Sequence, residues 1–178
     1  MFRMKKGLIH VYCGEGKGKT TAAAGLSIRA AGCGMKVVFL QFLKAMESGE
    51  IEILRNIDNI TVIRNEEDYG FFNRMTEEEK EAITELHNKN LKKALDLVDN
   101  GQCDLLVLDE ACAAYNHNLL DRTLVENLIQ NKKEALELVL TGRDPAPLFV
   151  EYADYVSEIR KIKHPYDKNI IARKGIEY

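Results

Sequence analysis

The chain has 178 residues, of which 46% are hydrophobic and 30% are charged, and its net charge is −3. This composition is typical of a folded globular protein. It excludes a disordered chain and a membrane span, because the apolar runs are far shorter than the roughly 20 residues that a membrane helix needs. The absence of a strongly basic block argues against nucleic acid as the main partner. No signal peptide is visible, so we expect one cytoplasmic domain over residues 1–178, without membrane association.

A glycine-rich loop follows the first apolar stretch, residues 8–12, and leads into an alanine-rich segment. The loop reads Gly14-Glu15-Gly16-Lys17-Gly18-Lys19-Thr20-Thr21. A strand, a glycine loop and a helix in this order predict a P-loop that binds ATP, in which backbone N–H groups and the helix N-terminus face phosphate oxygens. Lys19 would supply a mobile positive charge, and Thr20 would supply a hydroxyl ligand for Mg²⁺. Because Cys13 replaces the usual first glycine and Lys17 is an additional lysine, we predict an unusual variant of this nucleotide site.

Apolar runs then alternate with helical patterns. Strands are expected at 36–42, 60–63, 104–110, 137–143 and 155–162, the last of them half exposed. Helices are expected at 20–31, 50–56, 76–101 and 121–131. A capping box of Thr76 and Glu79 would begin the third helix, Asp144 and Pro145 would begin a further brief helix, and the tail 164–178 would wrap the surface. This order predicts an α/β fold of the P-loop NTPase-like (RecA-like) type, with a mostly parallel sheet flanked by helices and ligands at the carboxyl ends of the strands.

Two expected strands end in polar residues. Asp109 and Glu110 close an apolar run, the position of carboxylates that hold Mg²⁺ directly or through water. The next strand ends in Thr141-Gly142-Arg143. A guanidinium there would contact a phosphate of ATP or form an ion pair with one of the two carboxylates, and both interpretations stay open.

The segment 66–75 contains an aromatic pair, Phe71 and Phe72, beside Gly70. Such a pair suits a large flat ligand, although packing in the core is an equally good interpretation. The four cysteines and four histidines have no metal-binding spacing, and we expect the cysteines to be free, largely buried thiols. No residue is placed like the water-activating group of a GTPase.

In combination, several of these segments resemble the P-loop ATP:cob(I)alamin (corrinoid) adenosyltransferases. The resemblance covers nearly the whole chain and is carried by residues 14–21, 41–44, 49–50, 70–71, 107–110, 141–143, 153–167 and the ending G-I-E-Y. It implies transfer of the 5′-deoxyadenosyl group of ATP to the cobalt of a reduced corrinoid, with release of triphosphate, in adenosylcobalamin synthesis or salvage. The reduced cobalt is itself the nucleophile, so no general base is required. Lys19 and Arg143 would be catalytic by stabilising the charge of the triphosphate.

The resemblance also implies that ATP is held with its phosphates reversed relative to ordinary P-loop enzymes. Aromatic side chains of the 66–75 segment would displace the lower ligand of cobalt, which assigns corrinoid binding to Phe71, Phe72 and Asn73. Phe71 matches the family pattern, whereas Asn73 stands where well-known members have tryptophan, and Phe72 is a possible substitute. A homodimer and a reducing protein, such as a flavoprotein, are further implications. The alternatives are a RecA-like ATP-binding regulatory module and an ordinary P-loop ATPase or kinase, and the reaction product separates them.

Overall fold

The fold is described here from a computed structural model, which covers residues 6–44, 48–65, 70 and 72–177. Six strands form one sheet, and every neighbouring pair in it is parallel. In spatial order these are β3 (Ile60–Arg64), β2 (Val37–Gln41), β4 (Leu105–Asp109), β5 (Glu137–Thr141), β1 (Ile9–Cys13) and β6 (Tyr155–Glu158). The predicted α/β, P-loop NTPase-like class is thereby confirmed.

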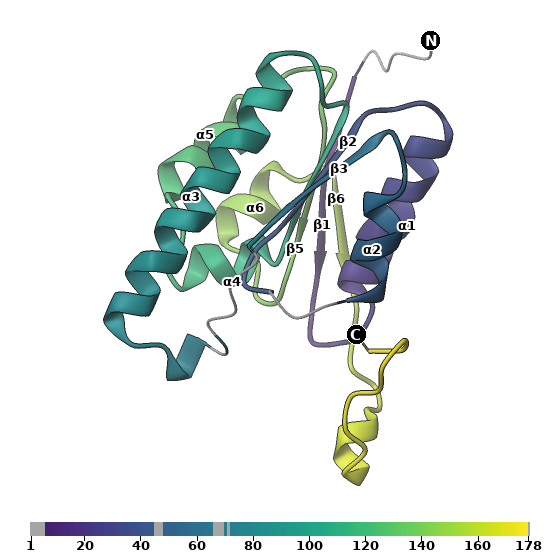
Figure 1. Ribbon diagram of the computed structural model, residues 1–178, viewed down its shortest axis with the longest axis vertical. Helices are drawn as coiled ribbons and strands as arrows, with labels where there is room; N and C mark the ends of the chain where they lie inside the picture. Colours follow the sequence, from purple (N-terminus) through teal and green to yellow (C-terminus); the bar gives the residue numbers. More distant parts are fainter. Residues whose placement is uncertain (1–5, 45–47, 66–69, 71, 178) are drawn as a thin grey trace.

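Helices cover both faces of the sheet (Figure 1). On one face lie α1 (Lys19–Gly32) and α2 (Gly49–Arg55), and on the other lie α3 (Glu77–Asp99), α4 (Ala111–Asn116), α5 (Arg122–Gln130) and α6 (Pro147–Tyr152). Short 3₁₀ turns span Phe72–Arg74 and Pro165–Lys168. Every residue of β2 and β4 is buried, which explains why these strands read as continuous apolar runs.

The ends of two helices test the sequence predictions. The capping box of α3 is confirmed, because the Thr76 hydroxyl accepts from the Glu79 N–H while the Glu79 carboxylate accepts from the Thr76 N–H. The predicted start of α6 is wrong: its N-cap is Ala146, and Pro147 takes the first turn. Asp144 has a φ of 47° and lies in the preceding turn. A left-handed residue does not supply the extended N-cap conformation, whereas the fixed φ of Pro147 suits a first helical position.

The carboxyl-terminal part of the chain also differs from the expectation. The last strand, predicted over 155–162, ends at Glu158, and all four of its residues are exposed. It pairs with β1 and is the outer strand on that side of the sheet. The tail does not wrap the surface, because its residues stay largely exposed and it extends away from the carboxyl end of the sheet (Figure 1).

The cysteines are free thiols, as predicted, and three of the four are buried. Cys33 is exposed. Burial raises the pKa of Cys103 and of Cys112 to about 12, which makes them inert structural thiols. None of the helices described here is both long and apolar enough to cross a membrane.

Candidate active site

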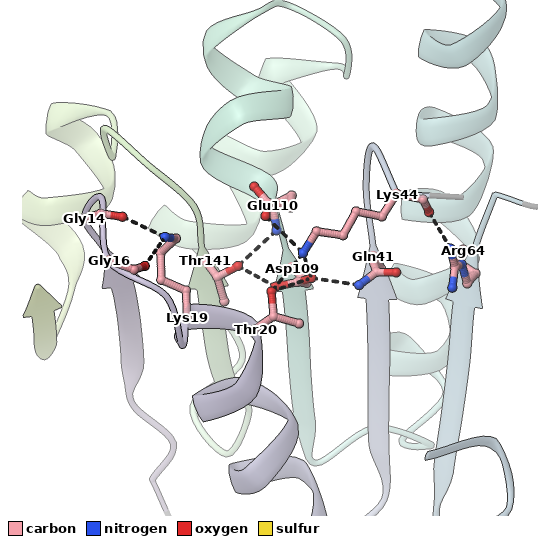
Figure 2. A network of polar contacts seen from close by, with 10 residues as sticks. All are labelled: Gly14, Gly16, Lys19, Thr20, Gln41, Lys44, Arg64, Asp109, Glu110 and Thr141. Atoms are coloured by element: carbon pink, nitrogen blue, oxygen red, sulfur yellow. Dashed lines mark hydrogen bonds and ion pairs between the residues drawn. The ribbon is translucent and has the colours of Figure 1, made fainter. Parts of the chain in front are cut away.

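The predicted nucleotide residues meet at the carboxyl end of the sheet (Figure 2). The glycine loop follows β1, and the ends of β2, β4 and β5 bring further polar side chains to the same edge. Parallel strands place their carboxyl ends on one side, so residues more than 100 positions apart in the chain become neighbours.

Close packing explains the unusual glycine spacing of the loop. A Cβ atom at Gly14 would lie 2.6 Å from the carbonyl oxygen of Ile159, and one at Gly16 would lie 2.7 Å from it. The same oxygen accepts the Gly16 N–H at 2.7 Å. Cys13, which replaces the usual first glycine, is the buried last residue of β1 and pairs with Glu158 of β6. The strand therefore continues one position into the usual motif, and the chain after β6 requires glycine at positions 14 and 16.

Lys19 lies over the loop that it follows. Its ammonium group donates to the carbonyl oxygens of Gly14 at 2.7 Å and Gly16 at 2.9 Å. Carbonyl oxygens are neutral acceptors, and a phosphate oxygen is a stronger partner for an ammonium group. The Lys19 ammonium group is thus placed to exchange these carbonyl partners for a phosphate oxygen.

Asp109 is the buried anchor of the site. Its carboxylate is fully buried and accepts hydrogen bonds from Thr141 Oγ1 at 2.6 Å, Thr20 Oγ1 at 2.9 Å and Gln41 Nε2 at 2.9 Å. A buried carboxylate is costly unless donors surround it, and here hydroxyl and amide groups from three elements supply them. Asp109 therefore fixes the relative positions of α1, β2 and β5.

Glu110 has a different environment although it is the next residue. Its φ of 59° places it in the left-handed region, and its N–H donates to Thr141 Oγ1 at 3.0 Å. A left-handed backbone is strained for a side chain with a Cβ, by roughly 1–2 kcal/mol. The Glu110 side chain is 23% exposed at the carboxyl end of the sheet, and its Oε1 lies 3.1 Å from Lys44 Nζ. Of the two predicted acids, Glu110 is the more accessible to a metal ion.

Lys44 belongs to the site, a placement that reasoning from the sequence did not reach. Its ammonium group lies 2.9 Å from Thr20 Oγ1, 3.1 Å from Glu110 Oε1 and 3.4 Å from Asp109 Oδ2. Burial opposes the charged form, but the two carboxylates outweigh it and the pKa of Lys44 is raised. The segment Gln41-Phe42-Leu43-Lys44 was a signal for this role, since it follows a strand and belongs to the family resemblance.

The backbone before Lys44 is held in a tight turn. Leu43 has a φ of 61°, and the Lys44 N–H donates to the Phe42 carbonyl at 2.7 Å. The Leu43 N–H donates to His87 Nε2 at 3.2 Å, and Arg64 donates to the Lys44 carbonyl at 2.9 Å. Burial lowers the pKa of His87 to about 4, so the ring is neutral at pH 7. Its Nδ1 lies 2.7 Å from the carbonyl oxygen of Leu119, which can only accept, so Nδ1 carries the proton and Nε2 is free to accept from Leu43.

The side chains around Asp109 fit Mg²⁺. Thr20 and Glu110 offer hard oxygen ligands of the kind that this ion prefers. Gln41 is 1% exposed, and its Oε1 has no hydrogen-bond partner in the described part of the chain, although its amide nitrogen must face the carboxylate of Asp109. A water bound to the metal would supply the missing donor. No group of three or more His, Cys, Asp or Glu side chains gathers among the described residues, so phosphates and waters would complete the coordination, as is usual for Mg²⁺ with nucleotides.

Two further charged residues line the loop. Arg143, after β5, forms an ion pair with Glu15 of the loop at 3.3 Å, and both side chains are more than half exposed. Arg143 thus pairs with Glu15 rather than with Asp109 or Glu110 as predicted, and its contact with a phosphate of ATP stays a prediction. Lys17 lies 4.0 Å from Glu177, which links the loop to the tail.

The predicted corrinoid residues are described in part. Phe71 lies outside the described residues. Phe72 stacks on His117 with ring centroids 3.9 Å apart, and Lys80 Nζ lies 5.0 Å from the centre of its ring. Asn73 is exposed. The 3₁₀ turn that holds Phe72 and Asn73 lies at the same end of the molecule as the glycine loop (Figure 1).

The sheet order and the glycine loop at the carboxyl ends of the strands define a protein of the P-loop NTPase-like fold class. The structure is similar to a KaiC-like protein from Pyrococcus horikoshii, with a TM-score of 0.55 and 16% identity over 91% of this chain and 75% of that one. It is also similar to ATPases 2 and 3 of EssC from Geobacillus thermodenitrificans, with a TM-score of 0.50 and 13% identity over 95% of this chain and 35% of that one. At these identities the likeness concerns the fold alone.

The sequence comparisons are more specific. Residues 5–178 match the family model of the ATP:corrinoid adenosyltransferases BtuR/CobO/CobP. Corrinoid adenosyltransferases from Pseudomonas aeruginosa and Sinorhizobium are 34% and 32% identical, over 99% and 98% of this chain and 86% and 81% of theirs. The corrinoid adenosyltransferase of Escherichia coli K12 is 31% identical over 98% of this chain and 87% of its own length. The chain belongs to the ATP:corrinoid adenosyltransferase family, and the predicted resemblance is confirmed.

Proposed function

We propose that this protein transfers the 5′-deoxyadenosyl group of ATP to the cobalt of a reduced corrinoid and releases inorganic triphosphate. The observation that carries the proposal is the family match over residues 5–178 together with the convergence of Lys19, Thr20 and Glu110 at one edge of the sheet. In this reaction a cobalt–carbon bond forms and the bond between the ribose 5′-carbon and the triphosphate oxygen breaks. Cobalt supplies the electron pair of the new bond, and the leaving oxygen keeps that of the old one.

The protein's own residues have two tasks in such a displacement. The glycine loop and Lys19 bind the triphosphate and stabilise the negative charge that grows on it, and Arg143 and Lys17 add positive charge at the rim of the loop. No proton is removed from the nucleophile, which is consistent with the side chains found here, since the buried Asp109 is occupied by donors and is no general base.

Mg²⁺ is part of the proposal. Thr20 and Glu110 would hold it, with Asp109 fixing the Thr20 hydroxyl at 2.9 Å. The ion would neutralise charge on the triphosphate oxygens. Phe71, Phe72 and Asn73 remain the proposed corrinoid contacts.

The proposed setting is a homodimer in the cytoplasm that takes electrons from a reducing protein such as a flavoprotein. The free thiols suit a reducing compartment. Strand β6 supports self-association, because Tyr155 and Val156 are 51% and 46% exposed on the outer strand of the sheet that the described residues form. Sedimentation of the wild type and of a Val156→Lys variant would test this interface, and a monomeric wild type would contradict it.

An anaerobic assay tests the activity. Protein, Mg²⁺-ATP and chemically reduced cob(I)alamin are mixed, and the absorption spectrum is followed as the cobalt–carbon bond forms. We expect formation that depends on ATP and is lost in Lys19→Ala. Absence of an ATP-dependent spectral change in the wild type would overturn the proposal and favour a regulatory module or an ordinary ATPase.

A further inference from the structure

The ammonium group of Lys44 lies beside Thr20 and Glu110, the two proposed Mg²⁺ ligands, and beside Asp109 (Figure 2). It lies 2.9 Å from Thr20 Oγ1, 3.1 Å from Glu110 Oε1 and 3.4 Å from Asp109 Oδ2. Magnesium binds oxygen ligands at roughly 2.0–2.1 Å. An ion bound to Thr20 and Glu110 would therefore lie within about 5 Å of the ammonium group and would share its two oxygen partners, so the two cations repel each other and compete for the same ligands.

The two lysines of the site have different partners. Lys19 donates to carbonyl oxygens of the glycine loop, which leaves the carboxylates accessible. Lys44 instead compensates the carboxylates of Asp109 and Glu110. Acidic groups in a partly buried site are costly without a cation, and the Lys44 ammonium group supplies that positive charge.

The surroundings of Lys44 allow its side chain to move while its backbone stays in place. Arg64 holds the Lys44 carbonyl at 2.9 Å, and His87 holds the preceding Leu43 N–H at 3.2 Å. The Lys44 side chain is 39% exposed, so it has a solvent side along which it can swing away from the carboxylates. The Lys44 ammonium group can therefore change its partners while the backbone stays in place.

We propose that the Lys44 ammonium group occupies the metal position when no nucleotide is bound. When the nucleotide binds, the Lys44 side chain moves its contacts from the carboxylates to triphosphate oxygens, and Mg²⁺ takes the position that it leaves. This inference rests on the proposed function, because it assigns Lys44 a positioning role at the same site. Two consequences follow. Metal binds weakly without a nucleotide, and metal and triphosphate strengthen each other's binding by the same factor, since binding free energies are reciprocally linked.

The first test measures Mn²⁺, a paramagnetic substitute for Mg²⁺, on the nucleotide-free protein by the electron paramagnetic resonance of the unbound ion. Lys44→Met should bind Mn²⁺ at least about tenfold more tightly than the wild type, the order expected when one charge-assisted contact no longer has to be broken. Lys17→Met is the matched control, because it removes a positive charge from the neighbouring loop without opening the metal position. It should change the affinity by less than about threefold.

Equal Mn²⁺ affinities of Lys44→Met and the wild type, or an equal gain in Lys17→Met, would overturn the inference. Circular dichroism and thermal melting verify that each variant is folded. Lys44→Gln is a second neutral variant with the same expected gain, so the test does not depend on Lys44→Met alone.

The second test adds inorganic tripolyphosphate, with its own complexation of Mn²⁺ measured separately. It should raise the Mn²⁺ affinity of the wild type by a factor that is about tenfold smaller in Lys44→Met, because the variant has no ammonium group to transfer. The same factor in both proteins would overturn the proposed transfer. A failure of the adenosylation assay with these binding results intact would instead count against the proposed function alone.

Discussion

Two regions of the molecule are built in different ways: the proposed triphosphate site, at the strand ends around Asp109, and the aromatic segment, residues 66–75. Around Asp109, hydrogen bonds from Thr20, Gln41 and Thr141 fix one arrangement of strand ends. The turn at Phe72 lies outside the sheet. Phe72 contacts the His117 ring, the Lys80 ammonium group and a small apolar cluster rather than a buried polar network. The comparison indicates that the proposed nucleotide site depends on strand ends whose positions the sheet fixes. The proposed corrinoid contacts depend on a segment whose geometry the sheet does not impose.

A variant at His87 tests how much this buried ring, which accepts from the Leu43 N–H, contributes to stability around the proposed triphosphate site. Its pKa is lowered from 6.5 to about 4 by burial, so the unfolded chain binds this proton first as the pH falls. The stability contributed by the neutral ring is complete above about pH 6.5 and is lost as the pH falls to about 4, by roughly 3 kcal/mol in total. Urea unfolding should show the stability gap between the wild type and His87→Gln narrowing by about this amount from pH 7 to pH 4. A gap that does not change with pH would show that the ring is not buried and neutral.

Lys19→Ala tests the phosphate contact at the same end. The lysine contacts loop carbonyls and is placed for phosphate, so its loss should weaken ATP binding by about thirtyfold or more, roughly 2 kcal/mol. The melting temperature should stay nearly unchanged, since a partly exposed lysine at the start of a helix contributes little to stability. Calorimetric titration with ATP makes the measurement, and an affinity within about threefold of the wild type would contradict the assignment.

Glu110→Gln separates the two neighbouring acids. Glu110 is partly exposed beside Lys44, so its neutralisation should cut turnover by about tenfold and change the Mg²⁺ requirement while leaving corrinoid affinity unchanged. Asp109→Asn is the matched variant, and it should lower the stability as well, by about 2 kcal/mol, because a donor-filled buried carboxylate is replaced. If Glu110→Gln leaves the Mg²⁺ dependence unchanged, Glu110 is not a metal ligand and Asp109 becomes the first candidate.

Phe71→Ala tests the aromatic segment. If Phe71 helps to exclude the lower ligand of cobalt, the substitution should impair adenosylation from cob(II)alamin with a protein reductant severalfold more than adenosylation of pre-reduced cob(I)alamin, which has already lost that ligand. Met75→Ala is the packing control, because Met75 is a buried member of the neighbouring apolar cluster and its truncation is expected to lower thermal stability without separating the two assays. Equal losses in both assays with a depressed melting temperature would return Phe71 to a packing role.

Much of the fold was predictable because local chemistry decides it. The apolar runs of β2 and β4, the capping box of α3 and the strand–loop–helix around Lys19 are all visible in the sequence. The alternation over 155–162 predicted a half-exposed strand, but the exposure of all four residues of β6 and its end at Glu158 were not visible, because they depend on which strand occupies the outer position of the sheet.

The position of Lys44 in the site was not predicted from the sequence for a similar reason. It is set by a left-handed Leu43 and by His87 from a helix 44 positions further along the chain. A contact between two distant elements leaves no local pattern, and only the motif Gln41-Phe42-Leu43-Lys44 pointed to this residue.

The fate of the three phosphates of ATP tests the central claim most directly. Separate reactions receive ATP labelled at the α- or the γ-phosphorus, with reduced cobalamin, and the products are separated by ion-exchange chromatography. The account predicts that both labels appear in the same intact inorganic triphosphate, in an amount equal to the adenosylated corrinoid. ADP with inorganic phosphate, or AMP with pyrophosphate, as the primary products would contradict it.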